Sequence, residues 1–122
     1  MIYYYKFYFY ESHKFAYLSH SNEFNLDFKY SYFIMKCNTD SMLPSIAQNE
    51  RIIVRGCEEE QIKDNKIYVF GYKDEIYIRR LVKNLDEIII KSDNQDPIYK
   101  AKTVKEEEIK IIGQVVSSIR AF

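Results

Sequence analysis

The chain has 122 residues, and its 18 Lys or Arg balance 18 Asp or Glu, so its formal net charge is zero. This length supports one domain with a buried core. A composition of 47% hydrophobic and 30% charged residues excludes a disordered or collagen-like chain. Because the net charge is zero, no global field attracts nucleic acid or an anionic membrane, and such binding would need a local patch or another segment.

Aromatic residues are unevenly distributed along the chain. There are 12 tyrosines and 8 phenylalanines, and 14 of these lie between Tyr3 and Phe33. We therefore divide the chain into an aromatic-rich segment over residues 1–32, with no clear helix-turn-helix pattern, and a β domain over residues 33–122. We expect the segment to pack on the domain as strands. The alternative is that it docks a partner, since tyrosine is enriched at interfaces.

The N-terminal stretch is apolar, but Lys6 and Glu11 interrupt it, and it lacks the basic leader and the cleavage site of a signal peptide. No run approaches the roughly 18 apolar residues of a membrane-spanning helix. Two cysteines are too few for a disulfide framework in a domain of this size, which favours a reducing compartment. We expect a cytoplasmic protein with no membrane contact.

A metal site is not expected. His13, His20, Cys37 and Cys57 follow one another at spacings of 7, 17 and 20 residues. No common zinc pattern has these spacings, so the sequence predicts no metal and no cofactor.

Beyond the aromatic segment, short β-branched and aromatic runs alternate with polar turns, which predicts strands. Lys73-Asp74 fits a tight hairpin turn, and Asn84-Leu85-Asp86 fits a second one. Asn49 and Asn65 stand where a turn needs a left-handed residue. The predicted strands are Phe33 to Cys37, Arg51 to Arg55, Lys66 to Tyr72, Glu75 to Val82, Glu87 to Lys91 and Ile109 to Ile119.

One polar turn carries the residues of chemical interest. Between the first two predicted strands the chain reads Cys-Asn-Thr-Asp-Ser-Met-Leu-Pro-Ser-Ile over residues 37–46. A lone serine in a turn is usually unremarkable, but three later segments accompany it in a fixed order. These are the hairpin strand Ile-Tyr-Ile-Arg-Arg-Leu over residues 76–81, the polar turn Ser-Asp-Asn-Gln-Asp-Pro over residues 92–97, and the glycine-containing strand Ile-Ile-Gly-Gln-Val-Val over residues 111–116.

With these segments the chain resembles the C-terminal domain of LexA and the phage repressors, self-cleaving serine peptidases whose fold is shared with bacterial signal peptidases. The resemblance covers Phe33 to Ile119. It implies a mainly β fold of small twisted antiparallel sheets, with Ser41 at the nucleophile position. It also implies that Asp40, Met42, Pro44 and Arg80 shape the site and that Arg79 occupies the position of the lysine base.

Arg79 is the important departure from the family pattern. A lysine can take a proton from a serine hydroxyl because burial lowers its pKa from about 10.4 toward neutrality. An arginine has a pKa above about 12 and stays charged, so it cannot act as that base, although it could still hydrogen-bond Ser41 or hold the turn by its charge. Lys83 is about 13 Å farther along the strand at 3.3 Å per residue, and Lys73 falls in the hairpin turn. The pattern predicts a disabled Ser-Lys dyad.

The segment that would contain the cleavage site departs from the family pattern as well. Relatives cleave themselves at a small-residue pair, commonly Ala-Gly, before the domain. Here the only alanine before Ser41 is Ala16, it precedes Tyr17, and no glycine precedes Gly56. The resemblance therefore implies a regulatory and dimerisation domain of a phage-repressor-like transcriptional regulator. The alternative is an active self-cleaving peptidase that uses Ser41 with an unorthodox base.

The resemblance also implies partners. We expect a homodimer through the final strand, over Gln114 to Ile119, and DNA contact only through a separate or missing DNA-binding domain. Tyr77 and Tyr99 are interleaved with basic residues in a way that nucleic-acid binders use, but nearby acidic residues favour an ordinary mixed surface. The basic residues are Arg79, Arg80, Lys83, Lys100, Lys102, Lys105 and Lys110.

Overall fold

The computed structural model describes residues 5–9, 14–18, 31–56 and 62–119. The segments 10–13 and 19–30, in which we found no helix-turn-helix pattern, lie outside the described residues. Within the described part there is no α-helix, and the one helical turn is the 3-10 helix η2 at Glu106–Glu108. The expectation of a mainly β protein is confirmed.

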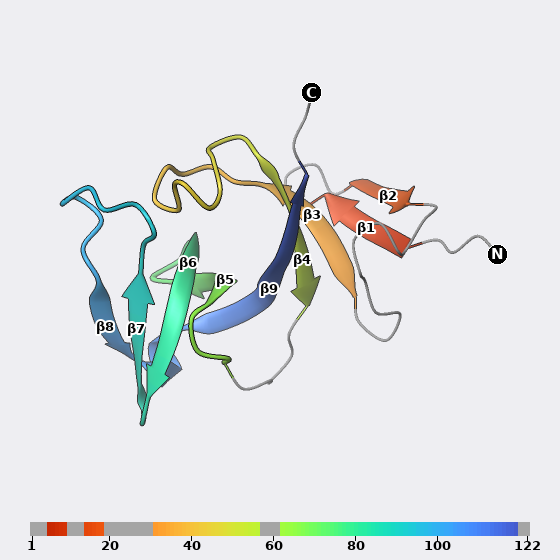
Figure 1. Ribbon diagram of the computed structural model, residues 1–122. Coiled ribbons are helices and arrows are strands. Elements are labelled where there is room, and N and C mark those ends of the chain that lie inside the picture. The colour runs from red at the N-terminus through yellow and green to blue at the C-terminus, as the bar shows by residue number, and fades with distance from the viewer. Residues whose placement is uncertain (1–4, 10–13, 19–30, 57–61, 120–122) are drawn as a thin grey trace.

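In the described residues, nine strands form one continuous sheet in the order β2-β1-β3-β4-β9-β5-β6-β7-β8 (Figure 1). Neighbours pair in antiparallel fashion from β3 onward, whereas β1 and β3 pair in parallel. The strands are β1 (Tyr5–Phe9), β2 (Lys14–Leu18), β3 (Tyr32–Lys36), β4 (Arg51–Gly56), β5 (Lys66–Tyr72), β6 (Glu75–Asn84), β7 (Glu87–Lys91), β8 (Lys102–Lys105) and β9 (Lys110–Ile119).

The last strand, β9, joins the two halves of the sheet. Its first half pairs with β5 and its second half with β4, so it bridges segments that are far apart in sequence (Figure 1). Register shifts occur in both pairings, between Ile53 and Val54 and between Val69 and Phe70. Such irregularities bend a strand and increase its local twist, which agrees with the curvature of β9 in Figure 1.

The predicted turns are present. Lys73 and Asp74 both have positive φ, as a two-residue hairpin between β5 and β6 requires. Asn49 and Asn65 also adopt the left-handed conformation, at φ 72° and 66°. The second hairpin is one residue tighter than predicted, because Asn84 pairs with Glu87 inside the strands and only two residues form the loop.

Two core clusters lie along the sheet. The first contains residues of β3, of β4 and of the turn between them, such as Met35, Ile52 and Met42, together with Ile78 of β6. The second contains Phe70, Leu81 and other residues of β5 to β8. Strand β6 contributes to both clusters. One of its faces adjoins the turn that contains Ser41, and the other face lines the pocket described below.

Candidate functional site

Ser41 lies in the turn between β3 and β4, and its side chain is fully buried. Its hydroxyl is paired with the hydroxyl of Thr39: Thr39 Oγ1 donates to Ser41 Oγ at 3.0 Å and accepts from the Ser41 backbone N–H at 3.1 Å. Serine and threonine side chains often bond to nearby backbone in this way and thereby fix polar turns. The partner of the Ser41 hydroxyl is therefore a neutral hydroxyl rather than an amine.

The residues that adjoin Ser41 divide into buried and exposed positions. Met42 is completely buried in the first core cluster, and the Ile46 N–H donates to its carbonyl at 3.0 Å. Asp40 and Pro44 are exposed. The Asp40 carbonyl accepts from the Leu43 N–H at 3.2 Å. The buried Met42 thus anchors the turn in the core, while Asp40 and Pro44 face outward.

A second polar turn, over residues 92–97 and here called the clamp, is hydrogen-bonded to the turn that contains Ser41, here called the serine turn. The Asn94 backbone N–H donates to the Ser41 carbonyl at 2.9 Å, and Asn94 Nδ2 donates to the Asp40 carbonyl at 2.9 Å. Ser45 Oγ donates to Asp93 Oδ2 at 2.5 Å. The resemblance gave this turn a place in the domain, but sequence reasoning did not assign Asp93, Asn94 or Thr39 to the site. Adjacent Asp and Asn after a strand were the available signal.

Arg80 connects strand β6 to this clamp. Its guanidinium forms a bidentate pair with Asp93, with Nε to Oδ1 at 2.9 Å and Nη2 to Oδ2 at 2.7 Å. The hydrogen bonds from Arg80 hold the pKa of Asp93 below its ordinary value, and the same contact raises the pKa of Arg80. Arg80 also donates to the Asn65 carbonyl. Arg80 therefore braces the 92–97 turn, which is itself hydrogen-bonded to the turn that contains Ser41.

Arg79 is partly buried, and the loss of hydration lowers its pKa from the usual value. Its Nη1 donates to the carbonyl of Ile78 at 2.9 Å, and the guanidinium lies 5.4 Å from the centroid of the Tyr77 ring. Within the described part of the chain, no hydrogen bond joins Arg79 to Ser41. The guanidinium still acts at longer range on Cys37, whose thiol pKa is raised mainly by burial and lowered in part by Arg79.

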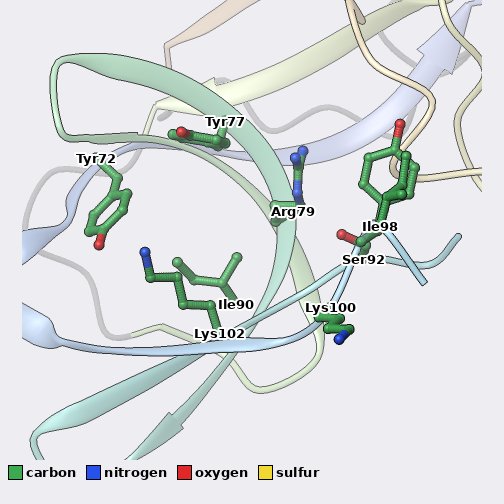
Figure 2. Close-up of a pocket in the computed structure, with 9 residues that line it drawn as sticks. Tyr72, Tyr77, Arg79, Ile90, Ser92, Ile98, Lys100 and Lys102 are labelled. Carbon is green, nitrogen blue, oxygen red and sulfur yellow. The ribbon is translucent and has the colours of Figure 1, made fainter. Parts of the chain in front are cut away.

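The two arginines point to opposite faces of β6, because successive side chains alternate along a strand. Ile78 packs in the cluster that contains Met42, and Arg80 reaches Asp93, so these even-numbered positions face the serine turn. Arg79 and Tyr77 instead line a pocket on the other face (Figure 2). Arg79, which the resemblance assigns to the position of the lysine base, therefore points into this pocket.

Four other lysines that could replace Arg79 as a base have different surroundings. Lys83 Nζ forms an ion pair with Glu106 at 3.2 Å, and Lys73 Nζ lies 5.3 Å from the Tyr72 ring centroid. Lys36 and Lys66 are exposed. Among the described residues, none of these four lysines hydrogen-bonds Ser41.

A metal centre is not apparent: in the described segments, no three His, Cys, Asp or Glu side chains gather closely enough to hold an ion. His13, His20 and Cys57 lie outside those segments, so the prediction about them stays a prediction. No helix in the described ranges has the length and apolar character to cross a bilayer.

An all-β sheet that presents a Ser-Met turn, braced by a polar turn and a cationic hairpin strand, defines a domain of the serine-peptidase-like class. The comparison with protein families agrees, because the Peptidase S24-like family matches residues 8–116. The chain belongs to this family, and the resemblance to LexA and the phage repressors is confirmed. No curated protein matches the sequence significantly.

Proposed function

We propose that this protein is a regulatory and dimerisation domain of a phage-repressor-like transcriptional regulator, with a degenerate self-cleavage site. The observation that carries the proposal is the pairing of the buried Ser41 hydroxyl with Thr39. The resemblance adds that Arg79 falls at the position of the lysine base. A buried hydroxyl becomes a nucleophile only when a positioned base removes its proton.

Two chemical arguments support the loss of self-cleavage activity. Arg79 stays protonated at any physiological pH even when burial lowers its pKa, so it cannot remove the Ser41 proton. The Thr39 hydroxyl is neutral and no better as a base than the serine that it would activate. Ser41 then serves the turn rather than a reaction.

The arrangement of β9 supports dimerisation. Val115 and the range 117–119 have strand partners on β4, whereas the pairing with β5 ends at Gln114. In the described part of the chain, the second half of β9 therefore has one backbone edge without a neighbouring strand. An open edge of this kind can pair with the same edge of a second copy about a two-fold axis. DNA contact would then come from a DNA-binding domain other than this β domain.

Prolonged incubation of the purified full chain at alkaline pH, followed by intact-mass spectrometry, tests the proposal. We expect the mass to remain that of the whole chain. A discrete fragment that appears in the wild type and is lost in Ser41→Ala would overturn the proposal and establish an active self-cleaving peptidase with an unorthodox base.

Arg79→Lys, compared with the matched change Arg80→Lys, distinguishes a silenced but intact site from a serine with a structural role only. Self-cleavage in Arg79→Lys alone would mean that the arginine silences an otherwise intact site. An unchanged mass in both variants would mean that Ser41 has a structural role only.

A further inference from the structure

The face of the sheet opposite the serine turn carries a pocket of about 180 Å³. Strands β5, β6 and β7 contribute residues to its lining, and the rest comes from the segment between Ser92 and Lys102, here called the wall (Figure 2). The residues used in the argument below are Arg79, Ile90, Ile98, Tyr99, Lys100 and Lys102.

The pocket gathers three positively charged side chains, and among the described residues no carboxylate lines it, although Glu108 acts on Lys102 from outside the lining. Its lining includes the cations Arg79, Lys100 and Lys102 and contains no Asp or Glu. Other basic residues of this part of the chain are paired, since Arg80 binds Asp93 and Lys83 binds Glu106. Within the described residues, the three pocket cations form no ion pair, so their charge remains available to a ligand.

Of the three cations, Arg79 is the one that an anion would stabilise most. Its guanidinium has lost part of its hydration, yet the hydrogen bond that it donates goes to a backbone carbonyl, that of Ile78. A desolvated charge is costly unless it is paired, and a planar guanidinium matches the oxygens of a phosphate or carboxylate in geometry. An anion in the pocket would therefore stabilise Arg79.

The end of the pocket at Lys102 and Tyr72 is positively charged as well. Lys102 Nζ lies 4.9 Å from the ring centroid of Tyr72, and Figure 2 shows the two side chains pointing toward each other. The interaction with Lys102 lowers the pKa of Tyr72, and Lys73 adds to that effect. The phenol thus responds to a local excess of positive charge at this end of the pocket.

An apolar rim accompanies the cations. Ile98 is 76% exposed, which is unusual for a large aliphatic side chain, and Tyr99 follows it in the wall. Ile90 adds apolar surface from β7. Tyrosine rings and exposed aliphatic groups provide a platform on which a planar ring can stack.

We infer that this pocket binds the phosphate of a 5′-mononucleotide, with Arg79 and Lys102 holding the phosphate and the base lying against Tyr99 and Ile98. Three cations favour a phosphate over a carboxylate, because a phosphate monoester carries about −1.5 to −2 charges and three acceptor oxygens at pH 7. The modest volume suits the phosphate and the sugar, while the base occupies the open rim. This inference does not depend on whether Ser41 is catalytically inert.

Calorimetric titration of the full chain tests the inference with three probes: AMP, adenosine and inorganic phosphate. We expect AMP to bind, and adenosine to bind at least about tenfold more weakly because it lacks the phosphate. Inorganic phosphate should compete with AMP at higher concentration. A 5′-phosphorylated oligonucleotide tests whether the pocket recognises the phosphate at the end of a nucleic acid strand. If the oligonucleotide binds much more tightly than AMP, the phosphate is that of a strand end rather than of a free mononucleotide.

Lys102→Gln and Arg79→Gln should each weaken AMP binding by about tenfold or more. Lys105→Gln is the matched control, because it removes the same charge from the same strand at an exposed position outside the pocket. If Arg79→Gln does not fold, the exposed Lys102 decides the test. The inference is overturned if AMP gives no saturable binding up to about 5 mM, if adenosine binds equally well, or if Lys105→Gln weakens binding as much as Lys102→Gln.

Discussion

Asp93 accepts two hydrogen bonds from Arg80, with Nε to Oδ1 at 2.9 Å and Nη2 to Oδ2 at 2.7 Å, while Ser45 donates to the same carboxylate. This pair joins strand β6, the polar turn at residues 92–97 and the turn that contains Ser41. Arg80 extends the connection to the Asn65 carbonyl. The conformation of the serine turn therefore depends on a carboxylate that lies more than 45 residues away in sequence.

Asp93→Asn should lower the free energy of unfolding by about 1–2 kcal/mol, because it removes a charge-assisted bidentate pair that is only partly exposed to solvent. Urea denaturation followed by circular dichroism measures the change. Asp86→Asn is the control, since Asp86 is exposed in the hairpin loop between β6 and β7, and its free energy of unfolding should change by less than about 0.5 kcal/mol. Equal effects of the two substitutions would show that the pair with Arg80 does not brace the turn.

The same pair predicts a pH dependence of stability. Arg80 lowers the pKa of Asp93 in the folded state, so the contribution is fully present above the unfolded pKa of about 3.9. It is lost as the pH falls through the lower folded value, where Asp93 becomes protonated in both states. The difference in unfolding free energy between the wild type and Asp93→Asn should stay constant above about pH 5 and shrink below about pH 4. A difference that persists undiminished at low pH would contradict this assignment.

Gly113→Ala should destabilise the sheet where β9 crosses β4. A Cβ at Gly113 would lie 2.5 Å from both the Arg55 carbonyl oxygen and Val54 Cγ1, so backbone must move. Overpacking of this kind costs about 1–3 kcal/mol. Gly71→Ala is the control in a neighbouring strand, since its Cβ would meet atoms no closer than 3.9 Å. Thermal unfolding of the two variants should separate them clearly, and similar midpoints would refute the close approach at Gly113.

Much of this sheet was predictable because the strands bury β-branched and aromatic side chains between turn residues with positive φ. The predicted runs from Lys66 and from Glu87 agree with β5 and β7 in full. Strand β8 was missed, since it is a four-residue edge strand whose single buried side chain is Val104. Short exposed strands carry little hydrophobic pattern, and their pairing is determined by tertiary contacts.

The site was predictable only in part, for a related reason. The Ser-Met pair stands out in the sequence through its place between two strands and its later companions. The hydroxyl partner Thr39 and the clamp residue Asn94 do not, because their hydrogen bonds exist only once the two turns meet. The pocket cations Arg79 and Lys102 are separated by 23 residues and come together through the pairing of β6, β7 and β8.

Leu85→Asn should stabilise the protein by about 0.5–1 kcal/mol, because Leu85 is held at φ 57° while its side chain is 87% exposed. Asparagine tolerates the left-handed conformation better than leucine, and little buried apolar surface is lost. Leu85→Ala, which keeps a penalised conformation without the tolerance of asparagine, should give no comparable gain. A higher thermal midpoint for the alanine variant than for the asparagine variant would refute this account of the turn.

Val116→Asp should weaken the proposed dimer. Val116 is 36% exposed on the half of β9 that has an open edge, and a two-fold axis there would bring two introduced carboxylates close together across the interface. Sedimentation equilibrium should show a dimer for the wild type and at least about a tenfold larger dissociation constant for the variant. Leu85→Asp, an equal change in charge at an exposed apolar residue away from β9, should leave the dimer intact. A monomeric wild type, or a Val116→Asp dimer of unaltered affinity, would remove β9 as the dimer interface.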